Sequence, residues 1–261
     1  MTAAVECHPT AVVDSSAELG AGVKIGPYAV IQGAARIGDG CEIGAFAVID
    51  PYVVLGRENH LFPHACVGSV PQDLKFHGEV SYLEVGDRNV FREFVTVNRG
   101  TEGGGGVTRI GSDNLFMAYS HVAHDCIVGD HTIFGNAAAL GGHVEVGDYA
   151  ILNAYAAVQQ FVRIGAHAYL AGHAGATLDI VPFAKLHGNP ARIIGLNAVG
   201  LRRRGFDGDT RRQLKRAYRV LFRDKLNTTQ ALAAIAAAEL DAPEVAQLVA
   251  FVESSERGIV K

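Results

Sequence analysis

A six-residue repeat of large apolar side chains is the feature that most constrains how this chain can fold. The repeat is unbroken over residues 13–67, returns over residues 85–97, and runs again over residues 110–170 with its phase shifted. An α-helix has a period of 3.6 residues and a β-strand a period of two, so neither produces this pattern. A hexapeptide repeat is instead the signature of a parallel β-helix. The sequence therefore predicts an all-β solenoid.

A second set of small residues lies four positions after each apolar one, as at Ala29, Ala35 and Cys41, and glycine often follows the apolar residue directly. We expect the large residue to fill the interior of a coil and the small one to fit near a corner. Glycine tolerates the tight backbone that a corner needs. Three six-residue units would make one triangular coil, and coils would stack at the strand spacing of about 4.8 Å.

Length and composition add few constraints. The chain has 261 residues, 31 glycines and no tryptophan, enough for one large solenoid and a small domain that covers its end. No charged leader precedes an early apolar run, so we expect no signal peptide or membrane span and a cytoplasmic location. The four cysteines lack metal-ligand or disulfide spacing and are expected to be reduced; Cys41 and Cys126 fall on small interior positions of the repeat and are expected in the core.

Two interruptions of the repeat predict loops. Asp73 and Glu79 occupy apolar positions between Val67 and Val85, so we expect residues 71–78 to form an extruded loop that replaces two walls of a coil. A second loop, around the glycines at 103–106, shifts the phase. Loops on a rigid scaffold commonly carry function, although neutral insertions would leave the same pattern.

The repeat fades after Leu170, and the pattern becomes helical from about residue 197. We predict a helix that opens at Asp209–Thr210, a second over residues 231–239 that Thr228 caps, and a third from Pro243 to about residue 254. The expected domains are a β-helix over residues 1–190 and a helical domain over residues 191–261.

Positive charge is concentrated in the helical part. Residues 202–225 contain ten Lys or Arg and three Asp. Such a face can be simply solvated, but it also suits an acidic protein or phosphate groups. Nucleic acid is disfavoured because no aromatic platform accompanies the charge.

The candidate site combines His121, His124, Asp125, Gly142 and His143. Because residues one coil apart should stack, His143 is expected above Asp125, and Gly142 above His124. Two chemistries suit this cluster. A histidine oriented by a carboxylate can act as a general base, with a glycine N–H stabilising an oxyanion. Alternatively, the three histidines can bind zinc.

Six segments resemble one known family: HPTA at 8–11, QDLK at 72–75, IGSDN at 110–114, AHDC at 123–126, GH at 142–143 and GLRRRGF at 200–206. Over nearly its whole length the chain resembles the UDP-N-acetylglucosamine 3-O-acyltransferases of lipid A biosynthesis. The periodicity does not set handedness, but the resemblance implies a left-handed parallel β-helix. It also implies a homotrimer with active sites between subunits, an acyl carrier protein as donor, a UDP-sugar as acceptor, and no cofactor or metal.

The resemblance further implies residue roles. His124 would be the general base, oriented by Asp125, that deprotonates the sugar 3-hydroxyl for attack on the donor thioester. The Gly142 N–H would stabilise the oxyanion, and Gly172 would occupy the position that gauges acyl length. The implied substrate-binding residues are Asp73, Lys75, His121, His143, Gln160, Asn197, Arg203 and Arg204.

Four departures from the family pattern are Asn98, Gln159 and Pro190, where histidine is usual, and Val199, where glutamate is usual. The last three belong to the nucleotide end of the site. An acyltransferase for another nucleotide sugar, such as a 3-amino analogue, is therefore one alternative. A zinc hydratase of the gamma carbonic anhydrase type and a non-catalytic scaffold are two others.

Overall fold

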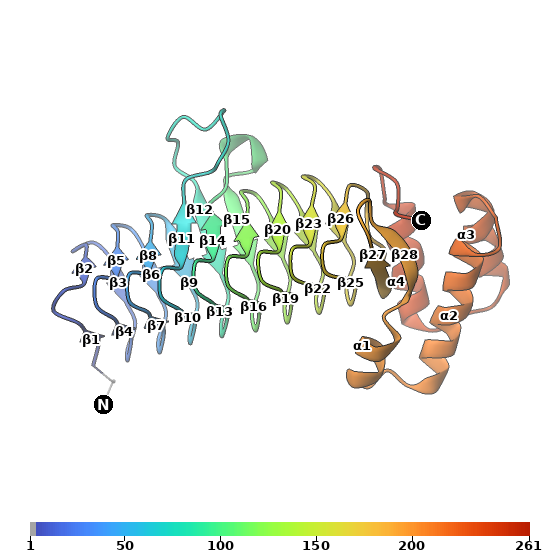
Figure 1. Ribbon diagram of the computed structural model, residues 1–261, viewed down its shortest axis with the longest axis horizontal. Helices are drawn as coiled ribbons and strands as arrows, with labels where there is room; N and C mark the ends of the chain where they lie inside the picture. Colours follow the sequence, from blue (N-terminus) through green and yellow to red (C-terminus); the bar gives the residue numbers. More distant parts are fainter. Residues whose placement is uncertain (1–3) are drawn as a thin grey trace.

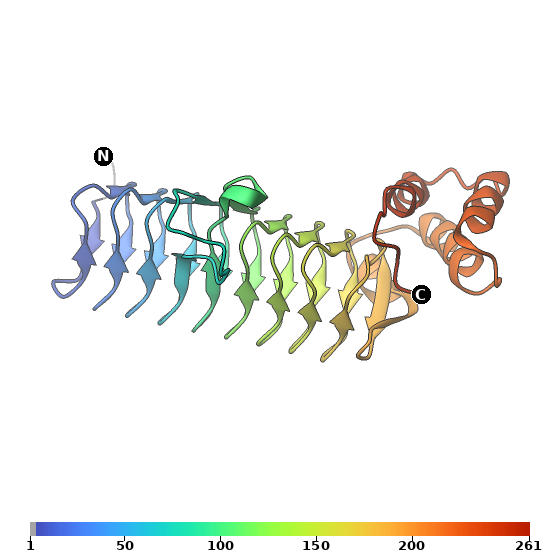
Figure 2. The same cartoon turned by 90° about the horizontal axis from the view of Figure 1, so that it is seen from above.

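The computed structural model describes residues 4–261. It contains a straight left-handed β-helix whose coils stack along one axis, followed by a cluster of helices, as Figure 1 shows. Each coil contributes one short strand to each of three sheets, here called walls 1, 2 and 3, and the stacked strands are parallel except for the last strand of wall 1. Figure 2 shows the same stack from above. The predicted solenoid, its handedness and the terminal helices are confirmed.

Wall 1 contains β1 (Glu6–Cys7), β4 (Lys24–Ile25), β7 (Glu42–Ile43), β10 (His60–Leu61), β13 (Val90–Phe91), β16 (Leu115–Phe116), β19 (Ile133–Phe134), β22 (Ile151–Leu152), β25 (Tyr169–Leu170), β27 (Ala184–His187) and β28 (Arg192–Leu196). Wall 2 contains β2 (Val12–Val13), β5 (Val30–Ile31), β8 (Val48–Ile49), β11 (Cys66–Ser69), β14 (Thr96–Asn98), β17 (His121–Val122), β20 (Ala139–Leu140), β23 (Ala157–Val158) and β26 (Gly175–Ala176). Wall 3 contains β3 (Glu18–Leu19), β6 (Arg36–Ile37), β9 (Val53–Leu55), β12 (Tyr82–Val85), β15 (Val107–Ile110), β18 (Ile127–Val128), β21 (Glu145–Val146) and β24 (Arg163–Ile164).

The interior is filled as the repeat predicts. The large apolar residues are buried, and three of them, Phe91, Phe116 and Phe134, stack in successive coils with ring centroids 4.9 and 4.8 Å apart. Cys41 and Cys126 are buried among the small residues, and burial raises the pKa of the Cys126 thiol to about 12. The hydrophobic effect acting on this continuous column is the main stabilising contribution.

The repeated glycines have a different role from the one expected. The left-handed backbone conformation at the corners falls on other residues, among them Asp125 and His143, each with φ of 60°. The glycines that follow the apolar positions are instead required by contact between coils. A methyl group on Gly44 would lie 2.7 Å from the carbonyl oxygen of Leu61 in the next coil. Glycine is therefore selected here by close approach.

Both interruptions are insertions at one corner, and the prediction that the first replaces two walls is wrong. The loop at residues 70–81 joins β11 of wall 2 to β12 of wall 3, and both walls continue through it. The loop at residues 99–106 joins β14 to β15 at the same corner and contains the short 3₁₀ helix η1 (Glu102–Gly104). The two loops project side by side in Figures 1 and 2. We call the corner between walls 2 and 3 the site corner.

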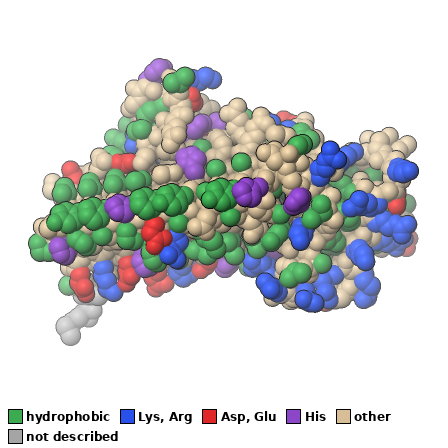
Figure 3. Space-filling view, viewed as in Figure 1, with side chains coloured by type: hydrophobic (Ala, Val, Ile, Leu, Met, Phe, Trp, Pro, Cys, Tyr) green, Lys and Arg blue, Asp and Glu red, His purple; other side chains and the backbone are tan. Residues whose placement is uncertain are grey.

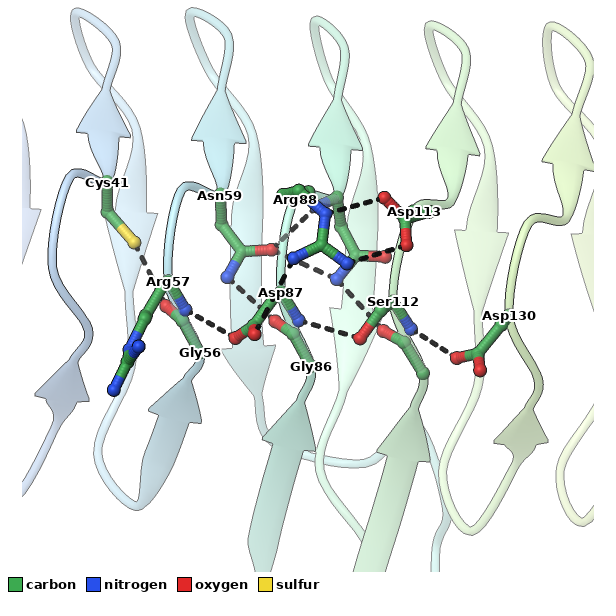
Figure 4. A network of polar contacts seen from close by, with 12 residues as sticks. Cys41, Gly56, Arg57, Asn59, Gly86, Asp87, Arg88, Ser112, Asp113 and Asp130 are labelled. Carbon is green, nitrogen blue, oxygen red and sulfur yellow. Dashed lines mark hydrogen bonds and ion pairs between the residues drawn. The ribbon is translucent and has the colours of Figure 1, made fainter.

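A ladder of buried polar side chains keeps the lengthened coils in register at the corner between walls 3 and 1. Asn89 Nδ2 donates to Asn59 Oδ1 at 3.0 Å and to the Gly111 carbonyl at 2.9 Å, and the Asn114 N–H donates to Asn89 Oδ1. Figure 4 shows Asn59 of this ladder, with Asp87, Ser112 and other corner residues beside it. The ladder contacts span 30 and 25 residues in the lengthened coils, against 18 in a regular coil.

We predict that Asn89→Ala lowers the free energy of unfolding by about 3 kcal/mol. The side chain is completely buried, and its loss leaves several buried polar groups without partners, each of which costs about 1–3 kcal/mol. Chemical denaturation measures the change. An exposed corner residue on the same side, Asp130→Ala, is the control and should change stability much less; equal losses would contradict a special role for the ladder.

The helices cover the end of the solenoid. The strand β28 folds back antiparallel on β27, and α1 (Ala198–Arg203), α2 (Gly208–Phe222), α3 (Thr228–Ala237) and α4 (Pro243–Glu253) follow. The Val260 N–H donates to the Asp179 carbonyl, which ties the segment after α4 back to the solenoid. Because β28 pairs with β27 across residue 190, the division at that residue stays a prediction. Within residues 4–261, no helix combines the length and apolar character needed to cross a membrane.

The helix boundaries differ in detail from the predictions. The helix α3 begins at Thr228, not at residue 231, and its cap is Asn227 rather than Thr228. Asn227 Oδ1 accepts the Gln230 N–H while Gln230 Oε1 accepts the Asn227 N–H, a capping box that satisfies two backbone N–H groups at the N-terminus of the helix. The helix α2 begins at Gly208, capped by Asp207, and the predicted third helix corresponds to α4.

Candidate active site

The candidate residues gather at the site corner as the coil register predicts. His124 and Asp125 follow β17, and Gly142 and His143 occupy the equivalent positions after β20, one coil further along. The His143 N–H donates to the His124 carbonyl at 3.0 Å, which fixes the two turns on top of each other.

His124 and Asp125 form a hydrogen-bonded dyad. His124 Nδ1 lies 2.7 Å from Asp125 Oδ2, and the two side chains are only 13% and 1% exposed. A carboxylate can only accept, so Nδ1 carries the hydrogen and Nε2 is left as the acceptor of the neutral ring. The dyad therefore holds the tautomer that a general base needs.

Gly142 lies against the ring of His124. A methyl group at this position would be 2.6 Å from the ring carbon Cε1, so only glycine leaves room for the imidazole. Within the described residues, no protein acceptor binds the Gly142 N–H. A backbone donor free of other partners and beside the base is suited to an oxyanion.

The two other histidines flank the dyad. His143 Nε2 is 3.7 Å from Asp125 Oδ2, and its ring stacks on Phe161 with centroids 4.3 Å apart. His121 Nδ1 is 2.8 Å from Thr96 Oγ1. Burial lowers the pKa of His143, although Asp125 opposes the shift, and burial together with His124 lowers the pKa of His121. Both rings are therefore neutral at neutral pH.

The first loop brings two predicted substrate residues to the same place. Asp73, Lys75, Thr101, His143 and Phe161 line one hollow of about 730 Å³. The Lys75 N–H donates to Asp73 Oδ1 at 3.0 Å, which shapes the tip of the loop. An ammonium and a carboxylate thus border the space beside the dyad.

The predicted nucleotide residues lie elsewhere on the chain. Arg203, Arg204, Asn197 and Val199 line a second hollow of about 720 Å³ over the outer face of wall 1. The guanidinium of Arg204 stacks over Tyr149 at 4.1 Å. The side chain of Asn197 is used within the fold, because Oδ1 caps α1 at the Gly200 N–H and Nδ2 donates to the His167 carbonyl.

Two further predicted positions follow the register. Gln160 stacks one coil beyond Gly142 at the site corner, next to the departure at Gln159. Gly172 is exposed at the corner between walls 1 and 2, less than two coils beyond Gly142, where a methyl group would meet only the Ala154 carbonyl at 3.4 Å. Gly172 therefore lies on the far edge of wall 2 from the dyad.

Thr101 is a site residue that the sequence did not indicate. Its N–H and its hydroxyl both donate to the Asp125 carboxylate, at 2.8 and 2.6 Å. Thr101 lies in an inserted loop outside the six-residue register, so no spacing argument places it against Asp125. The TxxG sequence that forms its cap on η1 is the only local signal.

A metal could be held by a different set of groups from the one expected. Within the described part of the chain, His124, Asp125 and His143 offer ligand atoms within 4.8 Å of one another, and His121 is not in this group. The alternative of a three-histidine zinc site in one chain is therefore not supported by the geometry.

Comparisons with known proteins agree with the fold. Residues 179–260 match the family model described as UDP N-acetylglucosamine O-acyltransferase, domain 2, and residues 16–51 and 108–142 match the bacterial transferase hexapeptide model. An acyl-acyl-carrier-protein–UDP-N-acetylglucosamine O-acyltransferase from Anaeromyxobacter sp. (strain Fw109-5) is 46% identical over 97% of this chain and 99% of that protein. The corresponding protein from Herminiimonas arsenicoxydans is 44% identical over 97% and 98%.

Solved structures are similar over nearly the whole chain. LpxA from Acinetobacter baumannii has a TM-score of 0.94 at 38% identity and covers 98% of this chain and 99% of its own. The UDP-N-acetylglucosamine acyltransferase LpxA from Bacteroides fragilis has a TM-score of 0.95 at 39% identity, over 97% and 99%. The chain therefore belongs to the family of acyl-acyl-carrier-protein–UDP-N-acetylglucosamine O-acyltransferases.

Proposed function

We propose that this protein transfers an acyl chain from an acyl carrier protein to the 3-hydroxyl of UDP-N-acetylglucosamine, the first step of lipid A biosynthesis. The observation that carries the proposal is the buried dyad, in which Asp125 fixes the His124 tautomer with Nε2 free to accept a proton. A zinc hydratase is less well supported, since the three histidines do not converge on one point.

The reaction follows from these groups. His124 Nε2 takes the proton of the sugar hydroxyl as the oxygen attacks the thioester carbonyl carbon. The carbonyl oxygen becomes an oxyanion that accepts the Gly142 N–H. When the intermediate collapses, the C–S bond breaks and the imidazolium returns the proton to the leaving thiolate. Asp125 stabilises the imidazolium between the two proton transfers.

A homotrimer would complete the site. The hollow beside the dyad and the hollow lined by Arg203 and Arg204 lie on different faces of one chain, so a second copy that faces wall 1 toward the site corner would bring them together. Figure 3 shows a row of hydrophobic and histidine side chains along the solenoid. At the corner between walls 1 and 2, Tyr28, Phe46, His64, Phe94 and Tyr119 stack at 4.9–5.0 Å with their outer faces exposed. Contact between copies would bury this row.

Acceptor choice is the direct test of the proposal. We expect purified protein to acylate UDP-N-acetylglucosamine in a mass-spectrometric assay against a panel of nucleotide sugars, including the 3-amino analogue. A preference for another acceptor would contradict the substrate assignment, and no transfer to any acceptor would contradict the reaction. Arginines 203 and 204 suit the diphosphate, whereas Val199 cannot supply the hydrogen bonds of a carboxylate.

Gln159→His combined with Val199→Glu should raise kcat/KM for UDP-N-acetylglucosamine about tenfold if these positions weaken acceptor binding. An unpaired polar group in a binding site costs about 1–3 kcal/mol, and the double variant restores both partners. Val199 lines the hollow of the arginines and is 53% exposed, so glutamate fits there. Each single variant serves as a control. A double variant slower than the unsubstituted protein would mean that neighbouring residues already compensate.

The basic helical end is proposed to receive the acidic donor protein. Lys and Arg gather over this end in Figure 3, and Arg216 and Arg219 on α2 are exposed. We predict that Arg216→Glu with Arg219→Glu weakens donor binding about tenfold or more and leaves acceptor binding unchanged. The affinity of the unsubstituted protein should fall as salt rises. Arg36→Glu at the far end of the solenoid is the matched control. Donor affinity that does not vary with ionic strength would contradict the proposal.

A further inference from the structure

The inserted loop at residues 99–106 holds the Asp125 carboxylate through one residue. The Thr101 N–H donates to Oδ1 and its hydroxyl to Oδ2, the oxygen that also accepts from His124 Nδ1. Thr101 is 8% exposed and the side chain of Asp125 is 1% exposed. This buried carboxylate therefore accepts three hydrogen bonds, and two of them come from Thr101.

The loop is folded around that contact. Thr101 Oγ1 accepts the Gly104 N–H at 3.2 Å, and the Thr101 carbonyl accepts the Gly106 N–H at 2.8 Å. The hydroxyl has one hydrogen, and since its oxygen is the acceptor for Gly104, the hydrogen is directed to Asp125. A methyl group on Gly104 would overlap the Asp125 carboxylate, so the loop backbone closes directly on the dyad.

We propose that Thr101 is a positioning residue that fixes Asp125 against His124 and limits how strongly the carboxylate attracts the imidazolium. Hydrogen-bond donors stabilise the charged form of a carboxylate and share its negative charge. With fewer donors, Asp125 would bind protonated His124 more tightly. The other titratable groups around the dyad are His121, His143, Asp73, Glu102 and Cys126.

The inference rests on the proposed function, and Thr101→Val with Thr101→Ser tests it. Valine has the same shape but no hydroxyl, whereas serine keeps the donor. For Thr101→Val we expect kcat to fall about tenfold, with KM for both substrates changed less than twofold, because one of several hydrogen bonds to a charged group is lost. The acid limb of the pH–kcat/KM profile should move to higher pH by about half a unit, because a carboxylate with fewer donors stabilises the protonated ring beside it more strongly. Thr101→Ser should restore both values.

Thr132→Val is the matched control. Thr132 is completely buried at the corner between walls 3 and 1, and its N–H and hydroxyl both donate to Asn114 Oδ1 at 2.7 Å. The same chemical change there removes the same kind of contact without touching the dyad. It should lower thermal stability and leave the acid limb in place.

The outcomes separate the possibilities. The inference is overturned if the acid limb stays in place for Thr101→Val and activity falls only in proportion to stability in both valine variants. Thr101 would then be purely structural. An NMR pH series on the His124 ring signal, assigned by its loss in His124→Ala, compares the unsubstituted protein with Thr101→Val and needs no activity. If the unsubstituted protein transfers no acyl group, the proposed function fails, yet the NMR experiment still tests the effect of the Thr101 hydrogen bonds on Asp125. Thr101→Ala, which also lacks the hydroxyl, replaces the valine variant if that does not fold.

Discussion

His124→Ala should reduce acyl transfer about 10²–10⁴-fold while the solenoid stays folded. A correctly placed general base contributes a factor of this order, and no other ring nitrogen takes over its position beside Gly142. The ring lies at the site corner, outside the apolar interior, so the solenoid should stay folded, and the loss of its hydrogen bond to buried Asp125 should lower stability by about 1–3 kcal/mol.

Turnover measured by mass spectrometry, with circular dichroism for folding, checks this prediction. His60→Ala is the control, because His60 is a half-exposed histidine on wall 1 near Glu42, remote from the site corner. Near-normal kcat in His124→Ala would refute the assignment of the base. A large loss in His60→Ala would show that activity depends on the solenoid surface in general.

Asp125→Asn should produce a loss of about 10²–10³-fold. Asp125 accepts hydrogen from the Thr101 N–H, the Thr101 hydroxyl and His124 Nδ1. An asparagine side chain has one oxygen and an NH₂ group, so at least one of these donors would face another donor. The ring of His124 would then lose its orientation and the charge that stabilises the imidazolium.

The pH dependence of kcat/KM should also change in a defined direction. Without the negative charge beside it, protonated His124 is less well stabilised, so the acid limb of kcat/KM should move to lower pH, opposite to the shift expected for Thr101→Val. Asp130→Asn is the matched control, since Asp130 is a corner carboxylate that accepts the Ser112 N–H in the network of Figure 4. An acid limb that moves upward in Asp125→Asn would contradict the role of the dyad.

Much of the site could be predicted because the repeat fixes which residues stack on one another in neighbouring coils. Wherever coils are regular, adding 18 residues gives the neighbour in the next coil, and this rule placed His143 near Asp125 and Gly142 against His124. The glycines in the repeat were recognised, but their reason was not, because a contact with the next coil cannot be distinguished from a turn requirement by composition alone.

The other features of the site and fold depend on contacts that the six-residue repeat does not determine. Thr101 reaches Asp125 from an insertion, where the register is suspended. The N-terminus of α3 was misplaced because Asn227 and Thr228 are both good capping residues, and only the reciprocal contact with Gln230 decides between them. The separation of the arginines from the dyad depends on which wall each segment follows, and periodicity within a strand does not specify it.

The placement of both insertions at a single corner has a consequence for how related proteins are compared. A coil that carries an insertion advances along the axis by the same step of about 4.8 Å as a coil without one. Axial position is therefore counted in turns of the winding, and a residue number is a poor guide to it. Two homologues with different loop lengths can hold the same catalytic geometry at very different sequence separations. Alignments of such chains should first assign each residue to a coil and a wall. Substitutions at equivalent positions can then be interpreted.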